Sequence, residues 1–159
     1  LDFSRHREPE FEIMNVNDVI EEVLLLIEIQ AIFQNIEIVR KLGLDLPSIK
    51  GDRSQLQQVF MNLAINAAEA MKGEGKLTIA TAFRGEVVIT FADTGLGIAP
   101  ENRDKIFEPF FTTRSDKGGS GLGLAISHGI ITGHGGTISF TSKVNEGTSF
   151  TVRLPVNTT

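Results

Sequence analysis

Residues 52–71 read DRSQLQQVFMNLAINAAEAM, and this stretch predicts a helix. Asp52, with Gln55 three positions later, is typical of a capping box, and Gly73 marks the end of the helix. The residues that share its apolar face are Leu56, Val59, Phe60, Leu63, Ala67 and Ala70. A separate polar stripe on successive turns contains Gln58, Asn62, Asn66 and Glu69. The two faces indicate two environments, of which only one is a core.

The polar stripe has two interpretations. Asparagine is a poor choice for ordinary surface in the middle of a helix, because its side chain competes for backbone hydrogen bonds. Its amide, however, offers a neutral oxygen that suits Mg²⁺ and an NH₂ group that can face phosphate. On this helix alone, solvated surface and a stripe that faces metal or phosphate both remain open.

A carboxylate and two glycines follow a predicted strand in the sequence DTGLG, residues 93–97. Asp93 ends the strand, and Gly95 and Gly97 allow the backbone to turn tightly and to approach a flat ligand. A buried carboxylate at this point could accept a hydrogen bond from the exocyclic amine of adenine, with the small residues leaving room for the ring. A plain strand-ending turn is the alternative.

A glycine cluster precedes an apolar helix that is predicted to end near Gly133. The cluster consists of Gly118, Gly119, Gly121 and Gly123. Free backbone N–H groups and the dipole of a helix N-terminus attract an anion. The pattern is neither the strand-led GxGxxG fingerprint of dinucleotide folds nor a P-loop, because no Gly-Lys-Ser or Gly-Lys-Thr follows. A structural hinge explains one or two of these glycines, whereas a phosphate-binding segment explains all four.

The rest of the chain predicts an α/β domain without strict βαβ alternation. Strands are predicted at residues 11–14, 36–42, 77–83, 87–92, 136–142 and 149–154, the last four as two hairpins. A helix over residues 19–27 follows Asn15 and Asn17, both good helix caps. Residues 99–119 form a long connection of low periodicity, and such connections in compact domains are often lids.

Composition narrows the class of protein. The 159 residues, 41% of them hydrophobic, are enough for one domain with a single core. Fifteen basic against twenty acidic residues give a net charge of −5, which makes nucleic acid an unexpected partner. The chain has no cysteine, so it has neither disulfides nor thiolate metal sites, and it is compatible with a reducing cytosol. Acidic residues interrupt the longest apolar stretch, so no membrane span and no direct membrane contact are expected.

The order of these motifs resembles that of a known family. The polar helix, the segment at Asp93, the sequence FEPFF at residues 107–111 and the glycine cluster match the N, G1, F and G2 boxes of sensor histidine kinases. The match runs from about Pro9 to Val156 and resembles the catalytic and ATP-binding domain of that family. These kinases share a superfamily with gyrase, Hsp90 and MutL. The resemblance implies an α/β two-layer sandwich, in which a mixed sheet packs helices on one face and carries a mobile ATP lid.

The resemblance also implies roles for individual residues. Asn66 would ligate Mg²⁺ and Asp93 would bind adenine, with Thr148 nearby. The other expected nucleotide-binding residues are Asn62, Glu69, Gly95, Gly97, Ile98, Thr112, Thr113, Arg114, Lys117, Gly119, Ser120, Gly121, Leu122 and Gly123. Glu69 is a departure, because many relatives have Lys or Arg there. A cation for the phosphates would then come from Arg114 or Lys117, unless both are solvated loop charges.

The phosphoacceptor is expected outside this chain. His6, His128 and His134 do not lie in the family's acceptor pattern and are interpreted as structural or surface residues. Residues 1–8 resemble the end of a dimerisation and phosphotransfer helix, and residues 9–159 the catalytic domain. The expected partners are the phosphoacceptor domain of the same protein and a response regulator. The fragment is expected to be a monomer and the intact protein a cytoplasmic homodimer, with any membrane anchor outside this chain.

Two other functions would use the same pocket. A conformational ATPase of the gyrase, Hsp90 or MutL type needs a glutamate one turn before the magnesium asparagine. Here that position is Asn62, which cannot act as a general base. A nucleotide-sensing module without transfer activity, or a serine kinase that switches off a sigma factor, would keep the pocket unchanged.

Overall fold

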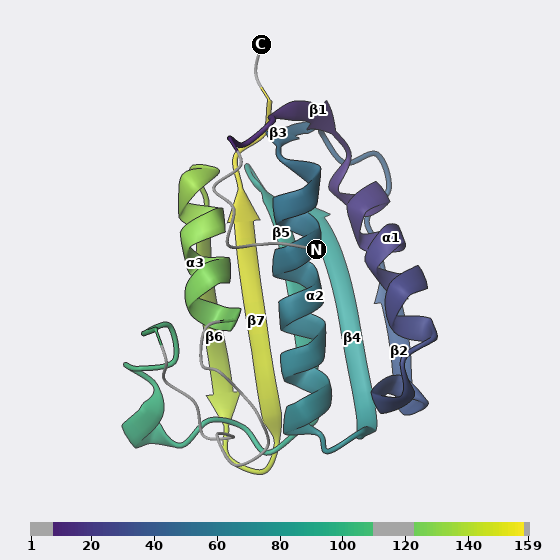
Figure 1. Cartoon of the computed structure of the whole chain (residues 1–159), viewed down its shortest axis with the longest axis vertical. Coiled ribbons are helices and arrows are strands. Elements are labelled where there is room, and N and C mark those ends of the chain that lie inside the picture. The colour runs from purple at the N-terminus through teal and green to yellow at the C-terminus, as the bar shows by residue number, and fades with distance from the viewer. Residues whose placement is uncertain (1–7, 110–122, 158–159) are drawn as a thin grey trace.

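A five-stranded mixed sheet forms one layer of the molecule, and helices form the other. The computed structural model describes residues 8–109 and 123–157. The strands lie in the order β2 (Asn35–Lys41), β4 (Glu74–Phe83), β5 (Val87–Asp93), β7 (Gly147–Leu154) and β6 (Thr137–Lys143). β2 is parallel to β4, and the other neighbours are antiparallel. In the described ranges, α1 (Val16–Glu28), α2 (Arg53–Ala70) and α3 (Gly123–Gly133) all cover the same face (Figure 1). The predicted two-layer sandwich is confirmed.

The helix α2 lies between α1 and α3 and packs on the middle of the sheet (Figure 1). Its fully buried side chains include Leu56, Phe60 and Leu63, as its apolar periodicity predicts. The ring of Phe60 stacks on Phe91 of β5, with centroids 5.8 Å apart. This contact fixes α2 across the central strand, so the polar stripe of the helix cannot face the sheet.

The predicted strands and hairpins are confirmed, and a short strand was missed. β1 (Glu12–Met14) pairs antiparallel with β3 (Ile49–Gly51) in a second, two-stranded sheet. The sequence predicts no strand at β3, because a strand of three residues has no period of its own. Two short 3₁₀ helices, η1 (Ala31–Phe33) and η2 (Pro100–Asn102), complete the described elements. None of the helices in the described ranges has the length and apolarity needed to cross a membrane.

The capping box at the start of α2 is half confirmed. Oδ1 of Asp52 accepts a hydrogen bond from the N–H of Gln55 at 2.9 Å, as predicted. The reciprocal bond is different, because the N–H of Asp52 donates to Nε2 of His134 at 3.0 Å. Nδ1 of His134 lies 2.8 Å from the carbonyl oxygen of Ile130, which identifies Nδ1 as the protonated nitrogen. His134 is therefore a buried structural residue, as its interpretation predicts.

Substituting Asp52 tests this junction. Asp52→Ala removes the cap of α2 and the acceptor, Oδ2, of the Glu10 N–H. We expect the free energy of unfolding to fall by about 1–3 kcal/mol. Urea denaturation measures it, and Ser54→Ala, at an exposed position of the same turn, is the control. A loss no larger than that of the control would contradict the role given to Asp52.

Candidate functional site

One buried carboxylate ends the central strand β5. Asp93 is 7% exposed, and its Oδ1 accepts two backbone hydrogen bonds, from Gly95 at 2.8 Å and from Thr148 at 3.2 Å. Within residues 8–109 and 123–157, Oδ2 has no hydrogen-bond partner. The backbone therefore orients the carboxylate through one oxygen and leaves the other available to a donor.

The surroundings of Asp93 raise its pKa above the ordinary value of 3.8. Burial is the largest cause, because it disfavours the charged form, and the hydrogen bonds from Gly95 and Thr148 act in the opposite direction. A buried carboxylate with a raised pKa, held by backbone hydrogen bonds, is typical of a functional position.

The glycines after Asp93 have a packing role that the sequence did not indicate. A side chain at Gly95 would meet the backbone of Ala70 at 2.7 Å. Gly97 has a φ of 76° and contacts the carbonyl oxygen of Lys143 so closely that no Cβ fits. Bonds from Leu96 N–H to the Ala70 carbonyl and from Asn145 N–H to the Leu96 carbonyl hold the segment in place. These glycines therefore let the loop lie against the end of α2 and the β6–β7 turn.

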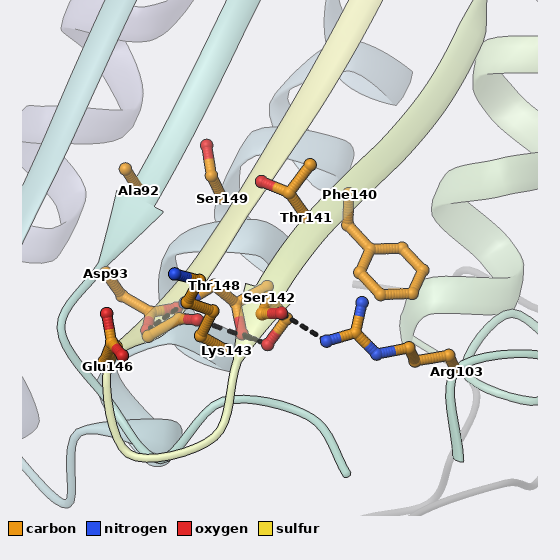
Figure 2. Close-up of a pocket in the computed structure, with 11 residues that line it drawn as sticks. Ala92, Asp93, Arg103, Phe140, Thr141, Ser142, Lys143, Glu146, Thr148 and Ser149 are labelled. Atoms are coloured by element: carbon orange, nitrogen blue, oxygen red, sulfur yellow. Dashed lines mark hydrogen bonds between the residues drawn. The ribbon is translucent and has the colours of Figure 1, made fainter. Parts of the chain in front are cut away.

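A pair of hydroxyls lies on the two strands of the β6–β7 hairpin. Ser142 of β6 and Thr148 of β7 are partners in the strand register, and their hydroxyl oxygens lie 2.9 Å apart. The N–H of Ile98 donates to Oγ of Ser142 at 2.7 Å, and the guanidinium of Arg103 donates to the Ser142 carbonyl. Figure 2 shows Asp93, Thr148 and Ser142 near the strand ends, with Arg103 reaching Ser142 from the other side.

Sequence reasoning missed Ser142, although a signal exists. Ile138 and Phe140 precede it at alternate positions of β6, on the side that faces the helices. A serine at the third such position breaks the apolar alternation, and it lies opposite the predicted Thr148. Polar residues at inward positions of a strand need partners, so this pair was detectable.

Asp93 and Thr148 also line a cavity of about 440 Å³ beside the β6–β7 hairpin (Figure 2). Its charged side chains other than Asp93 are Arg103, Lys143 and Glu146. The remaining lining residues are Ala92, Phe140, Thr141, Ser142, Gly147 and Ser149. The cavity is therefore polar where it borders the predicted base-binding residues.

The polar stripe of α2 faces the start of α3. Nδ2 of Asn62 donates to the carbonyl oxygen of Gly123 at 3.2 Å and to Oγ of Ser127 at 3.3 Å. Asn66 and Glu69 follow on the next turns, and both are half-buried. Asn62 thus joins α2 to α3, and the stripe runs from there towards Ala70, which contacts the loop after Asp93.

The predicted site residues divide into two groups. Nine lie in the described residues, on α2, α3, β7 and the segment from Asp93 to Ile98. They are Asn62, Asn66, Glu69, Asp93, Gly95, Gly97, Ile98, Gly123 and Thr148. The others, Thr112, Thr113, Arg114, Lys117, Gly119, Ser120, Gly121 and Leu122, lie outside the described residues, as do residues 110–119 of the expected lid.

Phe107 is a partly buried side chain that packs against the core. The ring of Phe107 lies 6.0 Å from Phe140 and 6.4 Å from Phe150, centroid to centroid, and 5.3 Å from the ring of His128. Phe110 and Phe111 lie outside the described residues. Phe107 anchors the segment that leads away from η2, and it contacts the sheet rather than the region of Asp93.

The raised pKa of Asp93 makes stability depend on pH. Because the pKa is raised in the folded state, the folded protein binds the Asp93 proton more tightly than the unfolded chain does. Wild type should therefore lose stability relative to Asp93→Asn as the pH rises from below 3.8 through the raised pKa, and the difference should level off above it. Urea unfolding of both proteins between pH about 3.5 and about 7 measures this difference. A difference that stays constant, or that favours wild type with rising pH, would contradict the assignment.

Comparison with known proteins places this chain in a family. Residues 51–158 match the family model described as "Histidine kinase-, DNA gyrase B-, and HSP90-like ATPase". The signal transduction histidine-protein kinase AtoS of Escherichia coli is 37% identical over 99% of this chain. The sensor histidine kinase ZraS of the same organism is 38% identical over 92% of it. The chain spans only 26% of AtoS and 31% of ZraS.

Solved structures agree with this match. The catalytic domain of the histidine kinase ThkA superimposes with a TM-score of 0.81 at 35% identity, over 92% of this chain and 96% of that domain. ThkA in complex with the response regulator protein TrrA gives 0.80 at 34% identity, over 98% of this chain and 44% of that one. Full-length ShkA in complex with AMPPNP gives 0.83 at 29% identity, over 98% and 33%. The chain therefore belongs to the histidine kinase-, DNA gyrase B- and HSP90-like ATPase family, and within it to the catalytic domains of histidine kinases.

Proposed function

We propose that this chain binds Mg-ATP and presents the γ-phosphate to a histidine on a separate dimerisation domain, as the kinase part of two-component signal transduction. The observation that carries the proposal is the carboxylate of Asp93, which backbone amides hold through Oδ1 while Oδ2 faces no donor in the described part of the chain. The exocyclic amine of adenine is a donor of the required kind. The structure of ShkA in complex with AMPPNP supports nucleotide binding by a protein similar to this chain.

Asn66 is proposed as the protein ligand of Mg²⁺. Its amide oxygen lies one turn beyond Asn62, which contacts the first residue of α3. Among the described residues, no three His, Asp or Glu side chains gather into a metal site. A single amide oxygen still fits, because Mg²⁺ usually takes one or two protein oxygens and completes its shell with water and phosphate. Bound there, Mg²⁺ would offset the charge of the transferring phosphoryl group.

The expected phosphate contacts are Gly119, Ser120, Gly121, Leu122 and Gly123. The cation that relatives place at position 69 would come from Arg114 or Lys117, because Glu69 is acidic. The described start of α3 at Gly123 supports a helix N-terminus near the phosphates, which suits an anion.

Transfer to an external histidine is favoured over hydrolysis of ATP. Asn62 occupies the position of the ATPase glutamate, and its Nδ2 is bonded to Gly123 and Ser127. An amide cannot take a proton from water, so this position provides no general base. Of the histidines in the chain, His134 is buried in the junction with Asp52, and His128 packs against Phe107. We therefore propose that the acceptor lies on another domain; His6 lies outside the described residues, and the greater length of AtoS and ZraS supports the proposal.

The partners follow from the same proposal. The phosphoryl group would pass from the acceptor histidine to the aspartate of a response regulator, and the complex of ThkA with TrrA supports a partner of this kind. The fragment would be a monomer that acts in the cytoplasm. The intact protein would be a homodimer, in which the linked domain raises the effective concentration of the acceptor histidine.

The metal role of Asn66 predicts an effect that depends on Mg²⁺. Asn66→Ala should weaken ATP binding about tenfold or more with Mg²⁺ present and much less in EDTA, because only the metal-bridged part of the affinity is lost. Isothermal titration calorimetry in both conditions measures it. Gln58→Ala, two turns earlier on the same stripe, is the matched control and should bind as wild type does. Equal losses with and without Mg²⁺ would contradict the ligand role.

Phosphoryl transfer separates the kinase from its alternatives. The fragment with γ-labelled ATP should release phosphate very slowly, and a separate acceptor domain should become labelled on histidine, inefficiently because the tether is missing. Histidine-bound label is acid-labile and base-stable. Fast phosphate release by the fragment alone would instead support a conformational ATPase. Acid-stable label on a serine of a partner would support the sigma-factor kinase.

A further inference from the structure

Ser142 is a buried hydroxyl that connects the base-binding residues to the segment leading away from them. It is 9% exposed, and its Oγ contacts three groups: the N–H of Ile98, the carbonyl oxygen of Gly147 and the hydroxyl of Thr148. Its carbonyl oxygen accepts from Arg103. One side chain thus ties the loop after Asp93 to both strands of the β6–β7 hairpin.

Counting protons limits what this hydroxyl can do. The N–H of Ile98 is a fixed donor, so Oγ of Ser142 is its acceptor at 2.7 Å. The single Ser142 proton then goes either to the Gly147 carbonyl, at 3.2 Å, or to Oγ1 of Thr148, at 2.9 Å. In the first arrangement Thr148 donates to Ser142 and offers a ligand only lone pairs. In the second arrangement the Thr148 proton is free to bind a ligand acceptor.

Asp93, which is bonded to the backbone of Thr148, indicates which of the two proton arrangements would help to bind adenine. The backbone N–H of Thr148 donates to Oδ1 of Asp93 at 3.2 Å, so the residue that carries this hydroxyl is bonded to the group proposed to read the exocyclic amine. The adenine ring nitrogens on either side of that amine, N1 and N7, are acceptors. A donor is needed for them, and Thr148 is a donor only while Ser142 gives it a hydrogen bond.

We propose that Ser142 is a positioning residue for base recognition, which donates its proton to Thr148 and so presents the Thr148 hydroxyl as a donor to a ring nitrogen of adenine. This inference rests on the proposed function, because it concerns the same nucleotide site. The bond from Ile98 holds Ser142 in place, so the loop after Asp93 and the hydroxyl pair act on the base together.

Deaza analogues of ATP test the role directly. 1-Deaza-ATP and 7-deaza-ATP each lack one ring nitrogen, and wild type should bind one of them more weakly than ATP. Ser142→Ala should lower the affinity for ATP about three- to tenfold, which is the usual value of one hydrogen bond. For the weaker-binding analogue, the affinity of Ser142→Ala should stay within about twofold of that of wild type. Calorimetry with Mg²⁺ present measures all three ligands. Ser139→Ala makes the same substitution at an exposed position of β6 and should change nothing.

A double-mutant cycle tests whether Ser142 acts on the base through Thr148. In a Thr148→Val background, Ser142→Ala should cost less than about twofold in ATP affinity, because the hydroxyl on which it acts is gone. Ser142→Cys keeps the volume with a weaker hydrogen bond and replaces the alanine variant if that variant does not fold. Equal losses for ATP and both analogues, or the full loss in the Thr148→Val background, would overturn the role of Ser142. Wild type that discriminates against neither analogue would also overturn it. Wild type that binds no ATP would overturn the proposed function as well.

Discussion

Burial of the apolar face of α2 against the centre of the sheet determines where the candidate site lies. Leu56, Phe60 and Leu63 are almost completely buried, and each such side chain contributes about 1.5–3 kcal/mol. Turning the helix to expose this face would lose all of these contributions at once. The stripe with Asn62 and Asn66 is therefore held away from the sheet and towards α3. No polar interaction of the site has to provide that orientation.

The same packing places two polar connections between α2 and α3. At the far end from the site, His134 accepts from the N–H of Asp52, and at the near end Asn62 donates to Gly123 and Ser127. Residues 10 and 11 also contact the pair formed by Asp52 and His134. The N–H of Glu10 donates to Asp52, and the ring of Phe11 lies 4.7 Å from that of His134. Contacts near both ends of α3 thus position this helix.

Periodicity predicted most of the fold, and the order of the motifs indicated the candidate site residues, whose roles stay predictions. The helix from Asp52 and both hairpins follow from local pattern. Contacts between residues that are far apart in the sequence do not follow from local pattern. The bond from Asp52 to His134 spans 82 positions, and it replaces the reciprocal half of a capping box. Gly95 and Gly97 also lie against the backbone of Ala70 and Lys143, a packing role that no local pattern indicates. β3 was missed because only its pairing with β1 makes it a strand.

The central claim is that Asp93 reads the base while Asn66 holds the metal. The most direct measurement is a crystal structure of this chain with Mg²⁺ and a non-hydrolysable ATP analogue. The account predicts the exocyclic amine of adenine about 3 Å from Oδ2 of Asp93, and the amide oxygen of Asn66 about 2.1 Å from Mg²⁺. A base whose amine points away from Asp93, or a metal ion held without Asn66, would contradict it.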